Sequence, residues 1–437
     1  MGEANTTSLH SVSPRFLLGF AAYVGAVPGP FLHPFARPAS DDFTTIVRGS
    51  GAAVWDSAGN RYVDALASLW FCGVGHGRAS VAEAIGRQAG TLAAFHTFER
   101  FTNEPAEQLA EVLVELAPMT DARVFFTSSG SEAVDSAMKL SRMSHVCAGH
   151  PEKTIIIGRN NGYHGVTYGG LSAQGIALNK VGFGPLLDDV EQVDHADIED
   201  AARLFAEKGD RIAAVIAEPV IGAGGVYPPA PGYLAGLRRL CDDHGAHLIL
   251  DEVICGFGRL GAWWGAQRYD VRPDLVTFAK GVTSGYVPLG GVLLARGVHE
   301  PLAADPAFLL RHGHTYSGHA TACAAALAVI DIIREESLAE RAAPIGTRIE
   351  SGLQALVADG LLDGVRGDHG IWAALVPGDA AQAVRDGMLA RGVISRYLGT
   401  SVVALCPPLV IDDADLDRCI EALHDSLVGN RDGASSV

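Results

Sequence analysis

Short apolar runs alternate with amphipathic stretches from about residue 120 onward. Apolar runs bounded by turn residues are typical of buried strands. The segments between them have helical periodicity, and the one at 233–245 ends on Gly245, a common helix stop signal. This alternation predicts an α/β domain with a large, mostly parallel sheet. The expected strands are 123–127, 154–158, 212–219, 247–252 and 275–280.

A different pattern follows and predicts a smaller α+β domain. It begins with an alanine-rich helix at 321–336 and ends with a helix for which Asp412 or Asp413 is the expected cap. Residues 52–68 have the pattern of a hairpin with its turn at 57–60, and this hairpin is expected to join the same domain. The strands expected in the C-terminal region are 371–376, 393–396 and 402–406.

These patterns divide the chain into three parts. Residues 1–75 are expected to contribute to the small domain and to a dimer interface. The large domain, which holds the candidate site, is expected at 76–330, and the C-terminal small domain at 331–437.

Composition and charge narrow the class of partner. The chain has 437 residues, 48% of them hydrophobic and 19% charged, which suits a compact globular enzyme. A net charge of −17 disfavours nucleic acid and anionic membranes as partners, because both would repel the surface. Small molecules are therefore the expected partners. Seven scattered cysteines without a CxxC pair indicate reduced thiols and a cytoplasmic location.

One apolar segment, 16–27, has the length of the hydrophobic part of a signal peptide. It is too short to span a bilayer, only one basic residue precedes it closely, and the sequence PGP follows it in place of a small-residue cleavage site. We therefore expect this segment to pack against a partner subunit.

Asp251 and Lys280 are the first two candidates for chemistry, because each ends a predicted buried strand. Ligands of parallel α/β sheets gather at the carboxyl ends of the strands. A carboxylate or an ammonium at such a position needs a partner, and a partly desolvated lysine is suited to Schiff-base chemistry. A direct ion pair between Asp251 and Lys280 is the structural alternative.

Two turns add candidates at the same edge of the sheet. The turn at Ser129, Gly130 and Ser131 precedes a helix, so its N–H groups could bind an anion, although Ser129 and Glu132 also fit a plain capping box. In the second turn Tyr163 could cover a planar ligand or simply close the core.

Six motifs in this order, SSGSEA, GYHG, AEPV.GAGG, ILDEV..GFGR.G, TFAKG and HTYSGHA, resemble those of the class III aminotransferases. These enzymes use pyridoxal 5′-phosphate and have fold type I, the fold of aspartate aminotransferase. The resemblance extends over roughly residues 45 to 428. It implies a homodimer or a tetramer with shared active sites.

The resemblance also implies roles for single residues. Lys280 would form the Schiff base with the cofactor aldehyde and then move protons at the substrate, while Asp251 would pair with the protonated pyridine nitrogen. The phosphate would be held by Ser129, Gly130 and Ser131, and by Thr315 of the neighbouring subunit. The residues that would surround the ring are Tyr163 on one face, Val253 on the other, and Glu218 as support.

The substrate branch is suggested by three positions. Ala223 stands where members acting on ornithine or aminobutyrate usually have a glutamate. Trp70 resembles a pocket tryptophan of the ω-transaminases, with a core aromatic as the alternative. Arg396 matches a mobile arginine that binds the keto-acid carboxylate. Tyr397 follows it where proline is usual, which puts the reach of Arg396 in doubt, and a strand-edge salt bridge is the alternative.

We therefore expect an (S)-selective aminotransferase that moves an amino group from a primary amine or ω-amino acid to a keto acid, with pyruvate as the acceptor. An aminomutase, racemase or decarboxylase on the same fold is the alternative. No metal is expected, because the histidines at 312, 314 and 319 lack a carboxylate or cysteine at matching spacing.

Overall fold

A computed structural model describes residues 30–434, with side chains up to residue 431. Internal contacts define two units, one ending at Thr45 and one beginning at Ile46. In the first unit, residues 30–45 contain neither helix nor strand, and the rings of His33 and Phe43 stack with centroids 3.7 Å apart. The apolar segment 16–27 lies outside the described residues, so its contact with a partner subunit stays a prediction.

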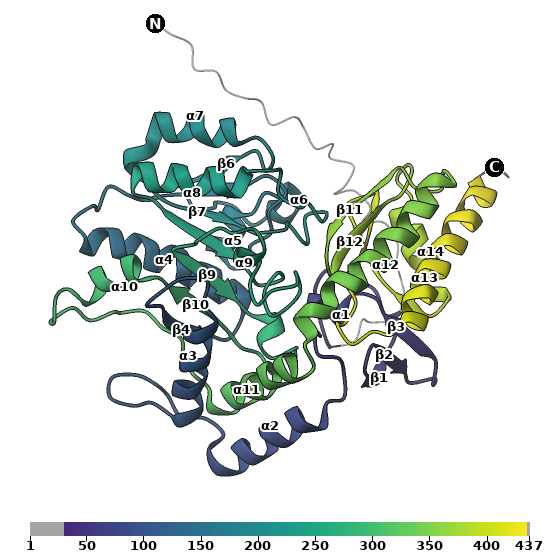
Figure 1. Ribbon diagram of the computed structural model, residues 1–437, viewed down its shortest axis with the longest axis horizontal. Coiled ribbons are helices and arrows are strands. Elements are labelled where there is room, and N and C mark those ends of the chain that lie inside the picture. The colour runs from purple at the N-terminus through teal and green to yellow at the C-terminus, as the bar shows by residue number, and fades with distance from the viewer. Residues whose placement is uncertain (1–29, 435–437) are drawn as a thin grey trace, which may run out of the picture. The chain divides into compact units, whose positions relative to one another are not determined.

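The second unit contains a seven-stranded sheet in the order β4-β10-β9-β8-β7-β5-β6 (Figure 1). All strands run parallel except β10, which lies antiparallel between β4 and β9. The sequence predicted this mostly parallel sheet but not β6 or β10, because β6 is half polar and β10 begins with two glycines. The strands are β4 (Arg123–Thr127), β5 (Ile155–Arg159), β6 (Val190–Val193), β7 (Ile212–Ala217), β8 (His247–Asp251), β9 (Leu275–Phe278) and β10 (Gly290–Leu294).

Side chains of the large sheet alternate between two hydrophobic clusters, one on each face. On one face Ile156 and Ile249 pack with α4 (Gly130–Cys147), which contributes Val134 and Met138. On the other face Leu250 and its neighbours pack with α8 (Tyr233–His244) and α11 (Ala320–Glu335). Because both faces are covered, the central strands β7, β8 and β9 are apolar along most of their length. Full burial of each such side chain contributes roughly 1.5–3 kcal/mol.

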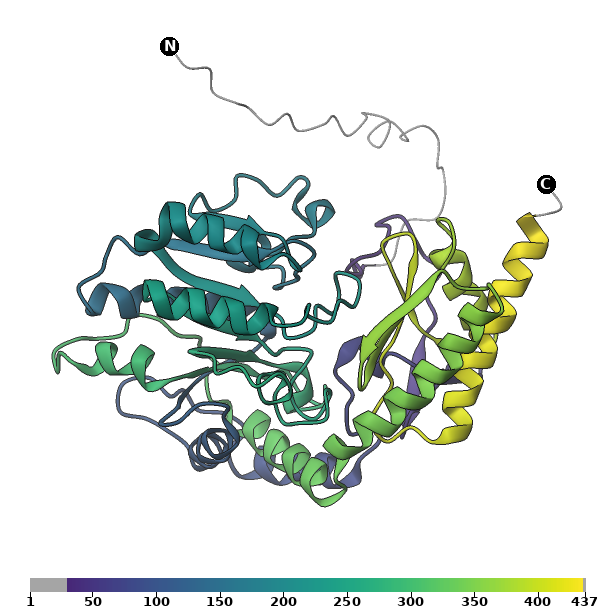
Figure 2. The same ribbon diagram turned by 45° about the horizontal axis from the view of Figure 1, so that its top comes forward.

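Strands of the C-terminal region belong to two further sheets of four strands each (Figure 2). One has the order β11-β12-β15-β14 and packs against α12. In the other, β13 pairs in parallel with β3, so the predicted hairpin shares a sheet with the C-terminal region. The elements are β1 (Ile46–Ser50), β2 (Ala53–Asp56), β3 (Arg61–Asp64), α12 (Leu338–Ala358), β11 (Gly364–Asp368), β12 (Ile371–Leu375), α13 (Ala381–Ala390), β13 (Val393–Ile394), β14 (Arg396–Leu398), β15 (Val402–Leu405) and α14 (Asp413–Ala434).

The predicted helix ends agree with the local chemistry. Gly245 follows α8 with a φ of 60°, the left-handed conformation that glycine favours. Asp412, one of the two expected caps, accepts a hydrogen bond from the N–H of Asp415 at 2.8 Å and so caps α14.

The domain boundaries stay a prediction, and α11 runs across the second of them. The remaining helices are α1 (Ala67–Trp70), α2 (Ala79–Leu92), α3 (Glu104–Leu116), α5 (Tyr168–Ala173), α6 (Ala177–Lys180), α7 (Ile198–Lys208), α9 (Gly265–Arg268) and α10 (Arg296–Ala303), with short 3-10 turns η2 (Gly209–Arg211) and η3 (Lys280–Val282).

Within residues 30–434, no helix combines the length and the apolar character needed to cross a bilayer.

A buried pair of histidines makes the stability of the fold depend on pH. The rings of His145 and His247 stack 4.1 Å apart, and His247 Nδ1 lies 2.9 Å from the hydroxyl of Ser141. Burial, with the nearby charges of His145, Arg238 and Lys153, lowers the pKa of His247 from 6.5 to about 3. Between these values the unfolded chain binds a proton here that the folded chain does not, so the free energy of unfolding falls as the pH drops.

We expect this ring alone to cost about 2 kcal/mol of stability between pH 7 and pH 5. Urea unfolding at both pH values should show the loss in the wild type and a smaller loss in His247→Asn. The exposed His150 offers a matched control, His150→Asn, which should keep the wild-type pH dependence. An unchanged acid dependence in His247→Asn would contradict this assignment.

Candidate active site

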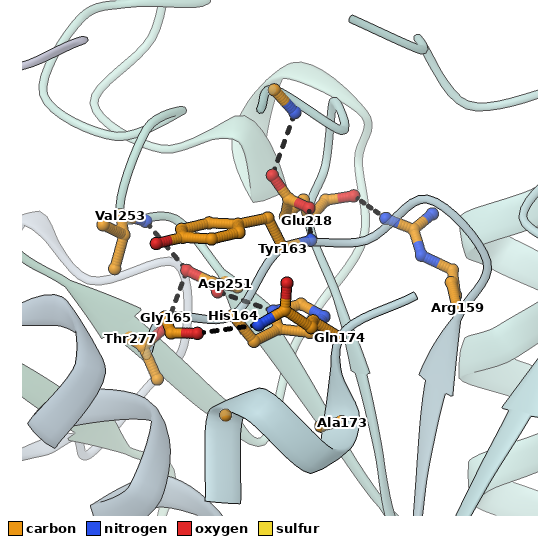
Figure 3. A network of polar contacts seen from close by, with 12 residues as sticks. Arg159, Tyr163, His164, Gly165, Ala173, Gln174, Glu218, Asp251, Val253 and Thr277 are labelled. Atoms are coloured by element: carbon orange, nitrogen blue, oxygen red, sulfur yellow. Dashed lines mark hydrogen bonds and ion pairs between the residues drawn. The ribbon is translucent and has the colours of Figure 1, made fainter. Parts of the chain in front are cut away.

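Polar side chains at the carboxyl ends of four neighbouring parallel strands meet at one edge of the large sheet, and Figure 3 shows those of Tyr163, His164, Glu218 and Asp251. Asp251 ends β8, Glu218 follows β7, Lys280 follows β9, and Tyr163 and His164 lie in the loop after β5. The carboxyl ends of parallel strands form the edge at which open α/β sheets bind ligands. The sequence-predicted residues of this edge are therefore brought together by the fold.

Asp251 is buried, 3% exposed, and is met by three donors (Figure 3). Its Oδ2 lies 2.8 Å from Nδ1 of His164, and its Oδ1 accepts hydrogen bonds from the Thr277 hydroxyl at 3.0 Å and the Val253 N–H at 3.2 Å. A carboxylate can accept about four hydrogen bonds. Three donors therefore leave room for one more at this carboxylate.

Glu252, the next acid in the sequence, has a structural role. Its carboxylate accepts hydrogen bonds from the N–H groups of Gly265 at 2.8 Å and Ala266 at 2.6 Å, which begin α9. Complete burial raises the pKa of this carboxyl to about 7, although the two N–H donors oppose the rise. Of the two adjacent acids, only Asp251 is directed to the candidate site.

Lys280 begins η3 with a φ of 45°, a left-handed conformation that is costly for a residue with a side chain. Desolvation lowers the pKa of its ammonium, while the charges of Asp251 and Glu218 act in the opposite direction. Among residues 30–431 this amine has no hydrogen-bond or ion-pair partner, so the direct Asp251–Lys280 pair considered above does not form. A lysine with a lowered pKa and no partner is suited to act as a nucleophile or base.

The turn before α4 is both a helix cap and a potential anion site. Ser129 Oγ accepts a hydrogen bond from the N–H of Glu132 at 3.2 Å, as in the expected capping box. The N–H groups of Gly130 and Ser131 have no acceptor within the described part of the chain. A β-carbon at Gly130 would lie 2.9 Å from Cγ1 of Val253, so only glycine fits between the helix start and residue 253.

Glu218 fixes the loop that carries Tyr163. Its Oε1 accepts a hydrogen bond from the Tyr163 N–H at 2.9 Å, and its Oε2 accepts one from the Gly222 N–H at 2.9 Å (Figure 3). Burial raises the pKa of the Glu218 carboxyl, with His164 acting against the rise. Gly165 of the same loop lies so close to Ser131 that a β-carbon there would collide with it. The loop thereby connects the turn before α4 with Tyr163 and Glu218 at the sheet edge.

Arg396 begins β14 of the small sheet and lies near Tyr163. Desolvation lowers the pKa of its guanidinium, and the nearby Tyr163 and Tyr397 oppose this effect. In the region from 30 to 431 the guanidinium of Arg396 forms no hydrogen bond or ion pair. The strand-edge salt bridge considered from the sequence is therefore absent from this region. A partly buried guanidinium without a counter-ion is suited to bind a carboxylate.

Trp70 is buried, in agreement with the alternative of a core aromatic. It packs in a cluster that includes Val220 and Ile254, which lie close in sequence to Glu218 and Val253. Ala67, Ser68 and Trp70 all have positive φ values, 48°, 58° and 68°. Trp70 therefore contacts residues adjoining the site from a sharply turned segment.

Thr315 is exposed in the loop between α10 and α11 and makes no hydrogen bond within the described chain. Residues 312, 314 and 319 belong to this loop. No group of three or more histidine, cysteine, aspartate or glutamate side chains in residues 30–431 is placed to hold a metal ion.

Three residues of this site were not predicted from the sequence. His164 and Thr277 both contact Asp251, and Arg159 donates a hydrogen bond to the carbonyl of Glu218. The position of His164 between Tyr163 and Gly165 was the available signal for it. Its Nε2 is buried without a partner among the described residues.

The donors and acceptors of the site match the groups of pyridoxal phosphate one by one. Two free N–H groups at a helix start suit its phosphate, the remaining acceptor position of Asp251 suits its pyridine N–H, and the unpartnered amine of Lys280 suits its aldehyde. The residues present therefore fit this cofactor.

Comparison with known proteins gives the family context. The family model described as Aminotransferase class-III matches residues 35–427. The omega-aminotransferase of Caulobacter vibrioides is 37% identical over 390 residues, covering 83% of this chain and 88% of that protein. The beta-alanine–pyruvate aminotransferase of Pseudomonas aeruginosa is 36% identical, covering 91% of this chain and 95% of that protein.

Among solved structures, an amine transaminase from an uncultivated Pseudomonas species, in its PLP-bound internal aldimine form, has a TM-score of 0.88 at 35% identity. The alignment covers 92% of this chain and 99% of that one.

Proposed function

Because the chain belongs to the class III aminotransferase family, we propose that it moves an amino group from a primary amine or ω-amino acid to a keto acid, with pyruvate as acceptor. Aminotransferases of this family are enzymes that depend on pyridoxal phosphate. The observation that carries the assignment to this site is that Asp251, with one acceptor position left, meets Lys280 at one sheet edge, where the Lys280 amine has no partner in the described part of the chain.

Each side chain of the site would hold one part of the cofactor. Gly130 and Ser131 would donate their N–H groups to the phosphate, and Asp251 would keep a proton on the pyridine nitrogen. His164 and Thr277 hold the carboxylate in place through hydrogen bonds of 2.8 and 3.0 Å. When bound, the cofactor supplies an electron sink for negative charge at the substrate Cα.

Lys280 would act twice in this scheme. Its amine would bind the cofactor aldehyde in the resting enzyme, and a substrate amine would replace it there. The freed amine would then serve as the base that takes the proton from the substrate Cα, and as the acid that delivers it to the cofactor carbon that had carried the aldehyde. A pKa lowered by burial keeps a larger fraction of this amine neutral and able to accept a proton.

Arg396 supports the choice of substrates. Its guanidinium lies near Tyr163 and has no counter-ion among residues 30–431, so it could bind the carboxylate of pyruvate or of an ω-amino acid. Ala223 leaves the turn after Glu218 without an acidic side chain. Relatives that cover most of the chain are named as an omega-aminotransferase and a beta-alanine–pyruvate aminotransferase.

Half-reactions with single substrates test the proposed donors. The loaded enzyme is mixed with aliphatic and arylalkyl amines, both enantiomers of a chiral amine, ω-amino acids and α-amino acids, and the visible absorbance of the cofactor is followed. We expect (S)-amines and ω-amino acids to convert it, and pyruvate to restore it with release of alanine. Conversion by α-amino acids alone would refute the substrate assignment, and consumption of donor without alanine would refute amino transfer to pyruvate.

Arg396→Ala is expected to raise the KM for pyruvate by roughly 10- to 100-fold, because it removes a charge-assisted contact with the carboxylate. The KM for a primary amine without a carboxylate should change by less than about threefold. Arg385→Ala is the matched control, because Arg385 pairs with Asp386 and lies over the ring of Tyr397. Equal effects on pyruvate and amine would contradict a carboxylate-binding role.

The proposed enzyme is a homodimer in which Thr315 reaches the phosphate site of the neighbouring subunit. The exposure of Thr315 supports this proposal. An exposed aromatic cluster formed by Phe95, His96 and Phe101, which are in mutual ring contact, is a second surface suited to a subunit interface.

A further inference from the structure

The loop that carries Thr315 is tied to α4 by one buried serine. Ser136, 0% exposed, lies on α4 within two turns of the helix start. Its hydroxyl lies 3.0 Å from Nε2 of His312 and 3.2 Å from Nε2 of His314. A single hydroxyl therefore contacts both imidazoles that precede Thr315.

The neighbours of these three residues set the direction of each hydrogen bond. The ammonium of Lys139 can only donate, so Nδ1 of His312, 3.0 Å away, accepts. His312 is therefore neutral and donates from Nε2 to Ser136, in agreement with a pKa lowered to about 4 by burial and by the charge of Lys139. The hydroxyl of Ser136 is then free to donate to Nε2 of His314.

The chain of contacts ends at the turn proposed to bind the phosphate. With Nε2 accepting, a neutral His314 has its proton on Nδ1, and Oε1 of Glu132 lies 4.0 Å from this nitrogen, an electrostatic contact and not a hydrogen bond. The other oxygen of Glu132 accepts a hydrogen bond from the N–H of Ser128 at 2.7 Å. Ser128 immediately precedes the capping residue Ser129. We call Lys139, His312, Ser136, His314 and Glu132 the α4 relay.

Independent anchors hold the other side of the loop. The Ser317 hydroxyl donates to the carbonyl of Phe126 at 2.8 Å, and the Asn103 amide donates to the carbonyl of Gly318 at 2.8 Å. Between these anchors and the α4 relay only Thr315 and Tyr316 remain, and both are exposed. The ring of Phe125 on β4 stacks on His312 with centroids 5.2 Å apart and so packs against the α4 relay. The loop thus presents Thr315 outward between two fixed points.

We propose that Ser136 is a positioning residue that, through His312 and His314, holds Thr315 for the phosphate site of the partner subunit and so determines how tightly the dimer binds pyridoxal phosphate. This inference rests on the proposed function. Ser136 lies inside the helix and touches neither substrate nor cofactor, so it acts only through the loop and the turn that it connects.

Cofactor affinity of the full-length dimer tests the proposal. Apoenzyme of the wild type, Ser136→Ala, Thr315→Ala and the double variant is titrated with pyridoxal phosphate, and the Kd and the release rate are read from the visible absorbance of the bound cofactor. Ser136→Ala and Thr315→Ala are each expected to raise the Kd by roughly tenfold, the loss of about one hydrogen bond to an anion. The double variant should show the same tenfold effect, because both changes remove one contact.

Controls separate this role from a general effect on the helix. Ser144→Ala removes another buried serine hydroxyl from α4, one without a side-chain hydrogen bond in the described chain, and should leave the Kd unchanged. His314→Phe interrupts the α4 relay from the loop side and should reproduce the Ser136→Ala effect. Sedimentation and thermal unfolding of the apoenzymes show whether each variant remains a folded dimer.

Three outcomes overturn the proposal. The first is a Kd for Ser136→Ala within twofold of the wild type, including the case in which only its melting temperature falls. The second is a Kd for the double variant near a hundredfold above the wild type, since multiplying effects would show that Ser136 does not act through Thr315. The third is an effect of Ser144→Ala as large as that of Ser136→Ala. A wild type that fails to bind pyridoxal phosphate at Lys280 would instead overturn the proposed function itself.

Discussion

Lys280→Ala is expected to reduce turnover by at least roughly 10³-fold while the protein remains folded. The variant loses both the amine that would bind the cofactor aldehyde and the base that would act at the substrate Cα, and a positioned acid or base alone contributes about 10²–10⁴-fold. The amine forms no hydrogen bond or ion pair within residues 30–431, so its removal breaks no described contact. Turnover is measured as alanine formed from pyruvate.

Borohydride reduction followed by peptide mapping identifies the same residue independently. The wild type loaded with pyridoxal phosphate should yield a cofactor adduct on the peptide that contains residue 280, and Lys280→Ala should yield none. Lys208→Ala is the control, because this lysine pairs with Glu191 away from the site and its loss should leave activity and adduct unchanged. Wild-type turnover in Lys280→Ala would show that the assigned role is wrong.

Asp251→Asn is expected to lower kcat by roughly 10²- to 10⁴-fold with most of the bound cofactor retained. The amide has nearly the shape of the carboxylate, so contacts with Thr277 and Val253 can persist. A neutral amide, however, does not hold a proton on the pyridine nitrogen, and negative charge at the substrate Cα is then stabilised less. The measurement is the single-turnover rate of the half-reaction at saturating amine, together with the cofactor content of each preparation.

The neighbouring acid provides the matched control for Asp251. Glu252→Gln changes a carboxyl that caps α9, so it should lower the melting temperature by a few degrees and leave the half-reaction rate within about threefold. Equal loss of rate in the two variants would mean that the strand end, and not the charge of Asp251, governs catalysis.

The fold was largely predictable because its signals are local. Each predicted strand of the large sheet is a run of apolar residues covered on both faces, and the ordered motifs correctly indicated fold type I and the class III family. The antiparallel strand β10 was missed because its first residues, Gly290 and Gly291, have the composition of a turn. Strand ends shifted by a residue or two, as in 212–219 against Ile212–Ala217.

The candidate site was predictable only in part, because several of its contacts join residues far apart in the sequence. Asp251 and Lys280 stand out as charges at the ends of apolar strands. His164 meets Asp251 from a position 87 residues earlier, and Ser136 meets His312 from 176 residues earlier. Neither periodicity nor spacing in the sequence predicts such pairs, since they depend on the order of strands in the sheet. The burial of Trp70 likewise depends on its packing with Val220 and Ile254, which lie far away in the sequence.

The position of β10 between β4 and β9 has a consequence for the size of ligand that the candidate site admits. Because β10 separates β4 from β9, the turn after β4 and the lysine after β9 are two strand spacings apart, roughly 9–10 Å across the sheet. Gly290 allows β10 to lie close to the turn at Ser129. A β-carbon at position 290 would lie 2.7 Å from the carbonyl oxygen of Ser129. The width of this single inserted strand thereby sets the distance between the turn after β4 and Lys280, and any bulkier residue at 290 would alter that distance.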